Sequence, residues 1–300
     1  MGGYPLIIDK LYDEVKMKGN VCVGLDTHLD YVPEEIKTKH QNIEDILFQF
    51  NKKIIDATID IVPIYKLQIA CYEAYGIKGL MSYKRTLEYI KANKSLSIGD
   101  VKRGDISSTA DMYAMGHFEG DFETDFITLN PYMGFDSITP YLRYVENGKK
   151  GIFVLLRTSN PGAMDIQYLK VEGTRKASTN DFLYYHVGDR LDEIASKYIS
   201  ECGYSPIGMV VGGTHVDEAR EIRDRYKNTF FLIPGYGHQG GKGRDVALYL
   251  NEGNGGIVNS SRGIILAYRG HEDGDTNFHN YARKAVIDMK GDIESEKILY

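Results

Sequence analysis

The stretch Ser97-Ile98-Gly99-Asp100-Val101-Lys102-Arg103-Gly104-Asp105-Ile106 begins as an apolar strand and ends in a dense cluster of charge. Asp100 and Lys102 are two residues apart, so on a strand both side chains point to the same face. Asp105 follows after a glycine that can bend the chain. Such charges are costly at the end of an apolar strand. The pattern therefore favours a functional site over a strand end that frays into a solvated loop with an incidental ion pair.

The composition is that of an ordinary globular protein, because the 300 residues are 42% hydrophobic and 26% charged. The formal net charge of -6 argues against broad binding to nucleic acid or to anionic membranes. Cys22, Cys71 and Cys202 are odd in number and widely spaced, which predicts reduced thiols rather than a disulfide framework. Met1–Lys18 has no cleavable signal pattern, and no apolar run reaches membrane-spanning length. We therefore expect a cytoplasmic protein.

Short apolar, β-branched runs recur along the chain and predict eight strands. They are Val21–Asp26, Ile61–Leu67, Leu96–Lys102, Asp125–Leu129, Gly151–Leu156, Ile207–Val211, Phe230–Pro234 and Gly256–Asn259. Most of the intervals can hold a helix. The predicted helices are Ile43–Ile59, Met81–Ile90, Ser107–Phe118, Ile138–Val145, Phe182–Ile199, Val216–Tyr226, Asp245–Leu250 and Phe278–Met289.

Alternation of strand and helix predicts a parallel sheet with crossover helices, and eight repeats predict closure into an α/β (β/α)8 TIM barrel. We expect one domain over residues 1–300, with an inserted loop at about 160–180. An open doubly wound sheet is the alternative. Its first turn should carry a Gly-rich phosphate fingerprint, which Gly24-Leu25-Asp26-Thr27-His28 lacks.

Polar side chains follow most of the predicted strands, where the catalytic groups of a barrel lie. They are Asp26, Lys66, Asp100, Lys102, Asn130, Thr158, Ser159 and the segment Ser260-Ser261-Arg262-Gly263. Each has an ordinary explanation, such as a helix cap or a solvated charge. Their shared placement favours a site at this end of the barrel.

The last two loops carry the chemistry of a phosphate site, which barrels often build after strands seven and eight. The glycines of Pro234-Gly235-Tyr236-Gly237-His238-Gln239-Gly240-Gly241 let backbone N–H groups approach an anion. Arg262, beside the start of a short helix, can hold a phosphate with two hydrogen bonds. The pattern is not a Walker A element, because Gly241-Lys242 lacks the glycine five residues earlier and the following Ser or Thr. The histidines show no ligand spacing, so no metal site is predicted.

With these motifs in place, the sequence resembles the orotidine 5′-monophosphate decarboxylase family, from about Val21 to Gly263. The Asp100-x-Lys102-x-x-Asp105 motif is shared with a wider superfamily of phosphosugar barrels. The more specific matches are Gly24-Leu25-Asp26, Lys66, Ser159-Asn160-Pro161-Gly162, the Pro234–Gly241 loop with Gln239, and Arg262. One departure is that Asn259-Ser260-Ser261 precedes Arg262, where many members have a Val-Gly-Arg run.

The resemblance implies conversion of orotidine 5′-monophosphate to uridine 5′-monophosphate and CO2, a step of de novo pyrimidine biosynthesis, with no cofactor and no metal. Loss of CO2 leaves charge at C6 of the pyrimidine, which the ammonium of Lys102 can stabilise and then protonate. Asp100 would hold Lys102 charged and oriented. Lys66 would continue the alternating chain of charges and touch the ribose hydroxyls.

The resemblance also implies a homodimer in which Asp105 enters the partner's site, close to the substrate carboxylate, together with Ile106 and Thr109. The remaining implied contacts are those of Asp26 with ribose, Ser159 with the pyrimidine edge, and Gln239 and Arg262 with phosphate, with Ser261 beside them. The closest alternative is a metal-dependent phosphosugar synthase or decarboxylase on the same barrel. A non-catalytic nucleotide-binding barrel is a second alternative, but it has no use for Asp100, Lys102 and Asp105 together.

Overall fold

A closed barrel of parallel strands forms the centre of the structure, a computed structural model that describes residues 6–171, 182–213, 216–237 and 240–297. Each strand in the described chain pairs with the next in sequence, and the last closes onto the first. The strands are β1 (Val21–Gly24), β2 (Ile64–Gln68), β3 (Leu96–Arg103), β4 (Phe126–Leu129), β5 (Gly151–Arg157), β6 (Ser205–Val211), β7 (Thr229–Pro234) and β8 (Gly256–Ser260). The predicted (β/α)8 fold is confirmed, and the open sheet is excluded because β8 pairs with β1.

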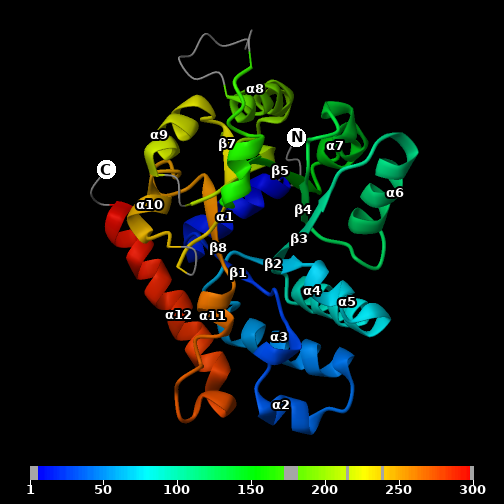
Figure 1. Cartoon of the computed structure of the whole chain (residues 1–300), viewed down its shortest axis with the longest axis vertical. Helices are drawn as coiled ribbons and strands as arrows, with labels where there is room; N and C mark the ends of the chain where they lie inside the picture. Colours follow the sequence, from blue (N-terminus) through cyan, green and yellow to red (C-terminus); the bar gives the residue numbers. More distant parts are fainter. Residues whose placement is uncertain (1–5, 172–181, 214–215, 238–239, 298–300) are drawn as a thin grey trace.

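Helices surround this barrel (Figure 1). The α-helices of the described residues are α1 (Ile7–Lys18), α2 (Glu34–Lys39), α3 (Ile43–Thr58), α4 (Ala70–Glu73), α5 (Gly76–Ala92), α6 (Ser107–Phe118), α7 (Thr139–Glu146), α8 (Leu183–Ala195), α9 (Val216–Arg225), α10 (Gly243–Ala247), α11 (Arg262–Ile265) and α12 (Gly274–Lys297). Every helix predicted from the sequence is present, and α6 has the predicted bounds. None of the described helices is long and apolar enough to cross a membrane.

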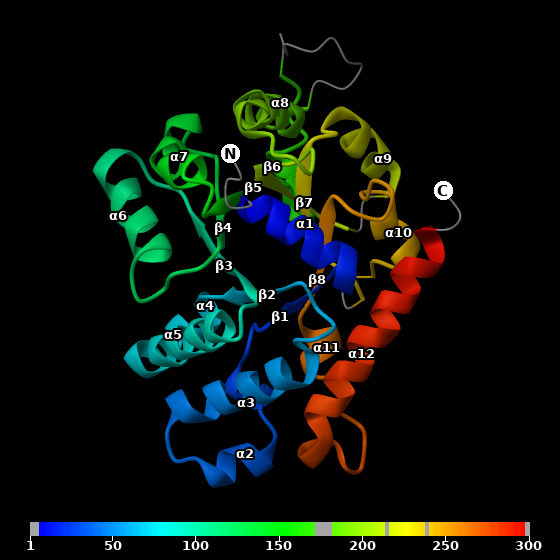
Figure 2. The same ribbon diagram turned by 180° about the vertical axis from the view of Figure 1, so that it is seen from behind.

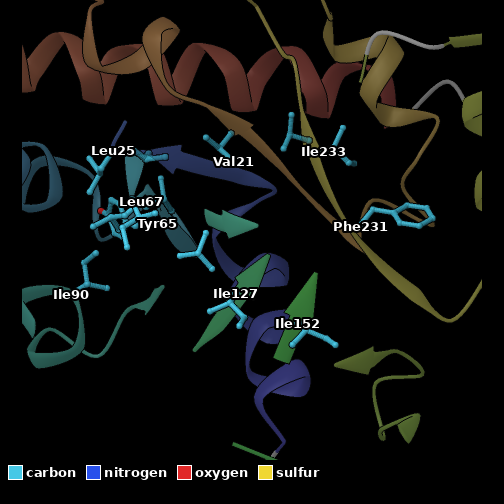
Figure 3. Close-up of a cluster of buried hydrophobic side chains, with 14 of the residues drawn as sticks. Val21, Leu25, Tyr65, Leu67, Ile90, Ile127, Ile152, Phe231 and Ile233 are labelled. Carbon is cyan, nitrogen blue, oxygen red and sulfur yellow. The ribbon is translucent and has the colours of Figure 1, made fainter. Parts of the chain in front are cut away.

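Alternation along the strands separates two apolar layers. Outward residues such as Tyr65, Leu67 and Ile127 belong to the large cluster beneath the helices (Figure 3). Inward residues such as Ile64 and Ile98 form a second cluster inside the barrel. The same inward face continues along β2 and β3 to Lys66, Asp100 and Lys102. The interior is therefore apolar at one end and charged at the other.

Helix α1 closes the apolar end of the barrel (Figure 2). Its buried side chains Ile7, Ile8, Leu11 and Val15 join the inner apolar cluster. Burial of four aliphatic side chains is worth several kcal/mol, at about 1.5–3 kcal/mol for each. No helix is predicted here from the sequence, although the apolar spacing of these residues is helical.

The stretch predicted to be an inserted loop at 160–180 is partly regular where it is described. A 3-10 helix, η3, covers Pro161–Asp165, and Lys170 forms an isolated antiparallel bridge with Phe182. The remainder of the predicted loop, residues 172–180, lies outside the described residues. Whether the stretch is an insertion relative to other barrels stays a prediction.

Candidate active site

Four side chains from three neighbouring strands form a chain of alternating charges at the carboxyl end of the barrel. Lys66 Nζ lies 3.0 Å from Asp26 Oδ1, just past β1, and 3.0 Å from Asp100 Oδ2 on β3. Lys102 Nζ lies 2.5 Å from Asp100 Oδ1. The structure thus brings together Asp26, Lys66, Asp100 and Lys102, all expected at the site from the sequence. Lys102 is the most exposed of the four, with 45% of its side chain exposed against 4% for Lys66.

These ion pairs keep all of the buried charges ionised. Burial disfavours the charged form of Lys66, but the carboxylates of Asp100 and Asp26 outweigh it and raise the pKa of Lys66 above its usual value. Burial likewise disfavours ionised Asp100, yet Lys66 and Lys102 outweigh it and hold the pKa of Asp100 below its ordinary value. Lys66 and Asp100 therefore form a pair of an ammonium and a carboxylate at neutral pH, rather than a neutral pair that shares a proton.

Asp100 also accepts hydrogen bonds from two neutral side chains that the sequence analysis did not single out. Gln68 Nε2 donates to Oδ2 at 3.1 Å, and Thr128 Oγ1 donates to Oδ1 at 2.9 Å. Strand alternation could have found both residues. Gln68 lies two positions after Lys66 on β2, and Thr128 lies two before Asn130, so each shares the inward face with a polar residue that was noted.

The absence of a side chain at Gly24 allows the residue after β8 to approach this cluster. The Ser261 hydroxyl, just past β8, donates to Asp26 Oδ2 at 2.7 Å. A Cβ on residue 24 would lie 1.9 Å from the Ser261 Oγ, so only glycine permits this approach. The hydroxyl of Ser261 thereby helps to orient Asp26.

A cavity of about 910 Å³ opens beside these charges. Lys66, Asp100 and Lys102 line one part of it, and Ser159, after β5, lines another. Apolar walls are formed by barrel and helix residues including Leu155, Val210, Leu232, Leu183 and Val187. This size and mixture of apolar walls with a few convergent polar groups are typical of a small-molecule site.

The cavity lining leaves out six of the expected site residues that the structure describes, which are Asp26, Ser261 and Arg262 after β1 and β8, and Asp105, Ile106 and Thr109 after β3. Asp105 is half-buried and accepts a hydrogen bond from the backbone N–H of Ile106 at 2.9 Å. Ile106 and Thr109, at the start of α6, are exposed. Asp105, Ile106 and Thr109 therefore lie outside the cavity of their own chain.

The expected phosphate residues differ in how far the structure describes them. Arg262 begins α11, directly after β8, and its side chain is exposed. Within the described part of the chain, its guanidinium has no hydrogen-bond or ion-pair partner. Gln239 lies outside the described residues, as does His238. The described residues also contain no group of three or more His, Cys, Asp or Glu side chains that could hold a metal ion.

A closed parallel barrel with polar and charged groups at the carboxyl ends of its strands is the architecture of the (β/α)8 enzymes. Within that class, the family model described as "Orotidine 5'-phosphate decarboxylase / HUMPS family" matches residues 19–274. The chain belongs to this family, as its sequence motifs indicated.

Relatives and solved structures agree with this membership. Orotidine 5'-phosphate decarboxylase of Petrotoga mobilis is 68% identical over 97% of this chain and 99% of its own length. The Clostridium acetobutylicum protein of the same name is 58% identical over 96% of this chain and 99% of its own length. The structure of OMP decarboxylase from Leishmania donovani superposes with a TM-score of 0.71 at 26% identity, covering 98% of this chain and 99% of that one.

Proposed function

We propose that this protein decarboxylates orotidine 5′-monophosphate to uridine 5′-monophosphate and CO2. The observation that carries the proposal is the chain Asp26–Lys66–Asp100–Lys102 at the mouth of the barrel, in a member of the orotidine 5′-phosphate decarboxylase family. An array of fixed ammonium groups suits a reaction whose difficulty is the stabilisation of a carbanion. The family's carboxy-lyase activity needs no cofactor.

Lys102 is the residue that we assign to the chemical step. Departure of CO2 leaves an electron pair on C6 of the pyrimidine, and an ammonium held beside C6 stabilises that charge in the transition state. The same ammonium then supplies the proton that replaces CO2. Lys102 suits this role because it lines the cavity and is the more exposed of the two lysines. Its contact with Asp100 fixes its position before the substrate arrives.

The other site residues bind and orient the nucleotide in this proposal. Asp26 and Lys66, which are already paired, face the ribose hydroxyls, and Ser261 supports Asp26. Ser159, which lines another part of the cavity, reads the pyrimidine edge. The phosphate is held by Gln239 and by Arg262, whose exposed guanidinium can form two hydrogen bonds with an anion.

We further propose a homodimer in which Asp105, Ile106 and Thr109 complete the partner's site. Large apolar side chains are exposed on the segments that follow β2 to β5, including Ile77, Ile106, Met112, Tyr132, Met133 and Ile166. Such an apolar surface is typical of a protein–protein interface. Its position beside the mouth of the barrel would bring Asp105 of one chain toward the cavity of the other.

We infer that the protein works in the cytoplasm. Cys22, Cys71 and Cys202 are free thiols, in keeping with a reducing compartment. Fractionation of cells that express the chain with a small tag should recover it with cytoplasmic markers. Recovery with a membrane or a secreted fraction would contradict this location.

The alternative, a metal-dependent phosphosugar enzyme, would use the same Asp100-x-Lys102-x-x-Asp105 set around Mg²⁺. Asp100 is already paired with Lys66 Nζ at 3.0 Å and with Lys102 Nζ at 2.5 Å, which supply its positive charge. The relatives named above give this alternative no support, because both carry the decarboxylase name.

The first prediction is decarboxylation of orotidine 5′-monophosphate by the purified chain in excess chelator. The loss of the orotate chromophore, followed by ultraviolet absorbance, should proceed at the same rate with and without chelator, and chromatography should identify uridine 5′-monophosphate. Unchanged absorbance under saturating substrate would contradict the proposed function. A reaction that stops on chelation and resumes with Mg²⁺ would instead support the metal-dependent alternative.

A further inference from the structure

Thr128 on β4 lies opposite an irregularity in the neighbouring strand β3. The paired residues are Gly99 with Ile127 and then Arg103 with Leu129. β3 thus advances four residues while β4 advances two, and the segment from Asp100 to Lys102 faces Thr128 alone. A bulge of this kind breaks the backbone ladder and re-aims the side chains that it carries.

The hydroxyl of Thr128 replaces backbone carbonyls of β4 as the hydrogen-bond acceptor for this part of β3. It accepts hydrogen bonds from the backbone N–H groups of Val101 at 3.0 Å and Lys102 at 2.9 Å. It also donates to Asp100 Oδ1 at 2.9 Å. A hydroxyl has one proton to donate and two lone pairs, so its capacity is fully used. The side chain is buried, with 2% of its surface exposed, and no water is needed to complete these contacts.

The backbone conformation of Lys102 indicates that the contact with Thr128 does more than satisfy hydrogen bonds. Lys102 has a φ of 43°, in the left-handed region that residues other than glycine seldom adopt. Such a conformation persists only where the surroundings hold it, and it is typical of functional sites. Here the Thr128 hydroxyl holds the N–H of Lys102 itself and, at the same time, the carboxylate that pairs with the Lys102 ammonium.

The geometry points to Thr128 as a positioning residue for the decarboxylation: through one hydroxyl it fixes both the bulge that aims Lys102 and the orientation of Asp100. This inference rests on the proposed function and adds a residue to it. Thr128 acts on the chemical step through Lys102 and Asp100. A buried strand position that served packing alone would accept valine, which has the same shape but no hydroxyl.

The test compares Thr128→Val with Thr128→Ser, which restores the hydroxyl. Thr128→Val should lower kcat by about 10- to 100-fold, because small misplacements of a reacting group cost about this much. Its KM and its Kd for uridine 5′-monophosphate should stay within about threefold of wild type, because the groups that bind the nucleotide are unchanged. Thr128→Ser should recover most of kcat.

Thr124→Val is the matched control. Thr124 is also a buried threonine, but it lies just before β4, where its hydroxyl donates to the backbone carbonyl of Phe126 at 2.9 Å. This variant should lose stability while keeping a wild-type kcat per folded molecule. Circular dichroism and binding of uridine 5′-monophosphate give the folded fraction of each variant.

A wild-type kcat in Thr128→Val would overturn the inference. So would equal losses in Thr128→Val and Thr128→Ser, or a loss confined to KM, since these would indicate packing or binding rather than orientation of Lys102. If Thr128→Val does not fold, Thr128→Ala replaces it in the same comparison with Thr128→Ser. Failure of the proposed function looks different, because the wild-type protein itself would then fail to turn over orotidine 5′-monophosphate.

Discussion

The carboxylate of Asp100 accepts four hydrogen bonds, two at each oxygen. Lys66 and Gln68 donate to Oδ2, and Lys102 and Thr128 donate to Oδ1. Charge-assisted hydrogen bonds of this kind are about twice as strong as neutral ones, and a full set fixes the carboxylate in one orientation. The arrangement explains why a buried carboxylate can stay ionised and can act as the support for Lys102.

The second prediction concerns Arg262, which begins α11. In the proposed function it binds the phosphate and takes no part in the chemistry at C6. Arg262→Ala should lower kcat/KM for orotidine 5′-monophosphate by about 10- to 100-fold, the usual cost of a lost charge-assisted hydrogen-bond pair. It should leave the slow reaction of orotidine, which lacks the phosphate, unchanged. Steady-state assays with both substrates measure the difference.

Arg283→Ala supplies the control, because the Arg283 guanidinium pairs with Asp60 on the outside of the barrel. It should keep wild-type kcat/KM for both substrates. Equal losses for orotidine and its 5′-monophosphate in Arg262→Ala would show that Arg262 does not hold the phosphate.

The charged residues could be predicted from the sequence, whereas for their neutral supports strand alternation gives only the inward face and not the role. A carboxylate or ammonium in an apolar run is conspicuous, since its burial is costly. Thr128 sits in the run Phe126-Ile127-Thr128-Leu129, where a threonine is an ordinary strand residue. Its importance comes from the bulge in β3, which depends on pairing between strands and leaves no local mark in the sequence.

The loop after β5 is an element whose position is set by one buried cation. Arg157, at the end of β5, donates to the Tyr168 hydroxyl at 3.1 Å and to Glu218 on α9 at 3.0 Å. Tyr168 in turn donates to Glu218. The network ties the segment that carries Ser159 to a helix of the outer ring. The network therefore helps to fix the position of Ser159, which lines the cavity.

The third prediction concerns this network. Tyr168→Phe removes the hydroxyl but leaves the Arg157–Glu218 ion pair, so the loop should shift without unfolding. We expect kcat/KM to fall by up to about 10-fold, less than for a group that touches the substrate. Tyr198→Phe is the control, because Tyr198 bonds Glu146 away from the cavity, in the 3-10 helix η4 (Ser196–Tyr198). If both variants retain full activity, the network serves stability alone.

The strands were predictable to within about three residues, whereas helices α5 and α12 are longer than their predicted ranges Met81–Ile90 and Phe278–Met289. The exceptions have physical reasons. Helix α1 precedes the first strand, so the alternation of strands and helices does not predict it. Its apolar side chains are buried only because the barrel closes beneath them. The short helices α2 and α4 lie within βα loops, and helices of this length depend on tertiary packing more than on local propensity.

At the scale of the whole molecule, the cavity of one chain does not include Asp105, which the partner supplies in the proposed homodimer. Mixing tests this as the fourth prediction. Lys102→Ala and Asp105→Ala dimers should each be inactive, but a mixed dimer has one barrel with intact Lys102 that receives intact Asp105. Random exchange makes about half of the dimers mixed, each with one working site, so about a quarter of wild-type activity should return.

Exchange must be shown independently, for example by co-purification of differently tagged chains. With exchange demonstrated, a mixture that stays inactive would mean that Asp105 serves its own barrel. The decarboxylase assignment would survive that result, although the shared site would not.

Closure of the barrel was predictable from the count of strand–helix repeats, but the size and shape of the cavity were not. Its walls combine residues from β4 to β7 with the beginning of α8, and no local pattern records which of these side chains meet. The substrate could be predicted only from the family resemblance, because an array of lysine and aspartate side chains suits several reactions of phosphorylated substrates.

The central claim is that the ammonium of Lys102, held by Asp100, performs the decarboxylation. The most direct test is the rate of uridine 5′-monophosphate formation by Lys102→Ala at saturating orotidine 5′-monophosphate. Lys284→Ala serves as the control, since Lys284 pairs with Asp288 on the exposed face of α12. We predict that Lys102→Ala folds and binds uridine 5′-monophosphate but loses about 10⁴-fold or more in kcat, while Lys284→Ala matches wild type. Turnover by folded Lys102→Ala within about tenfold of wild type would contradict the account.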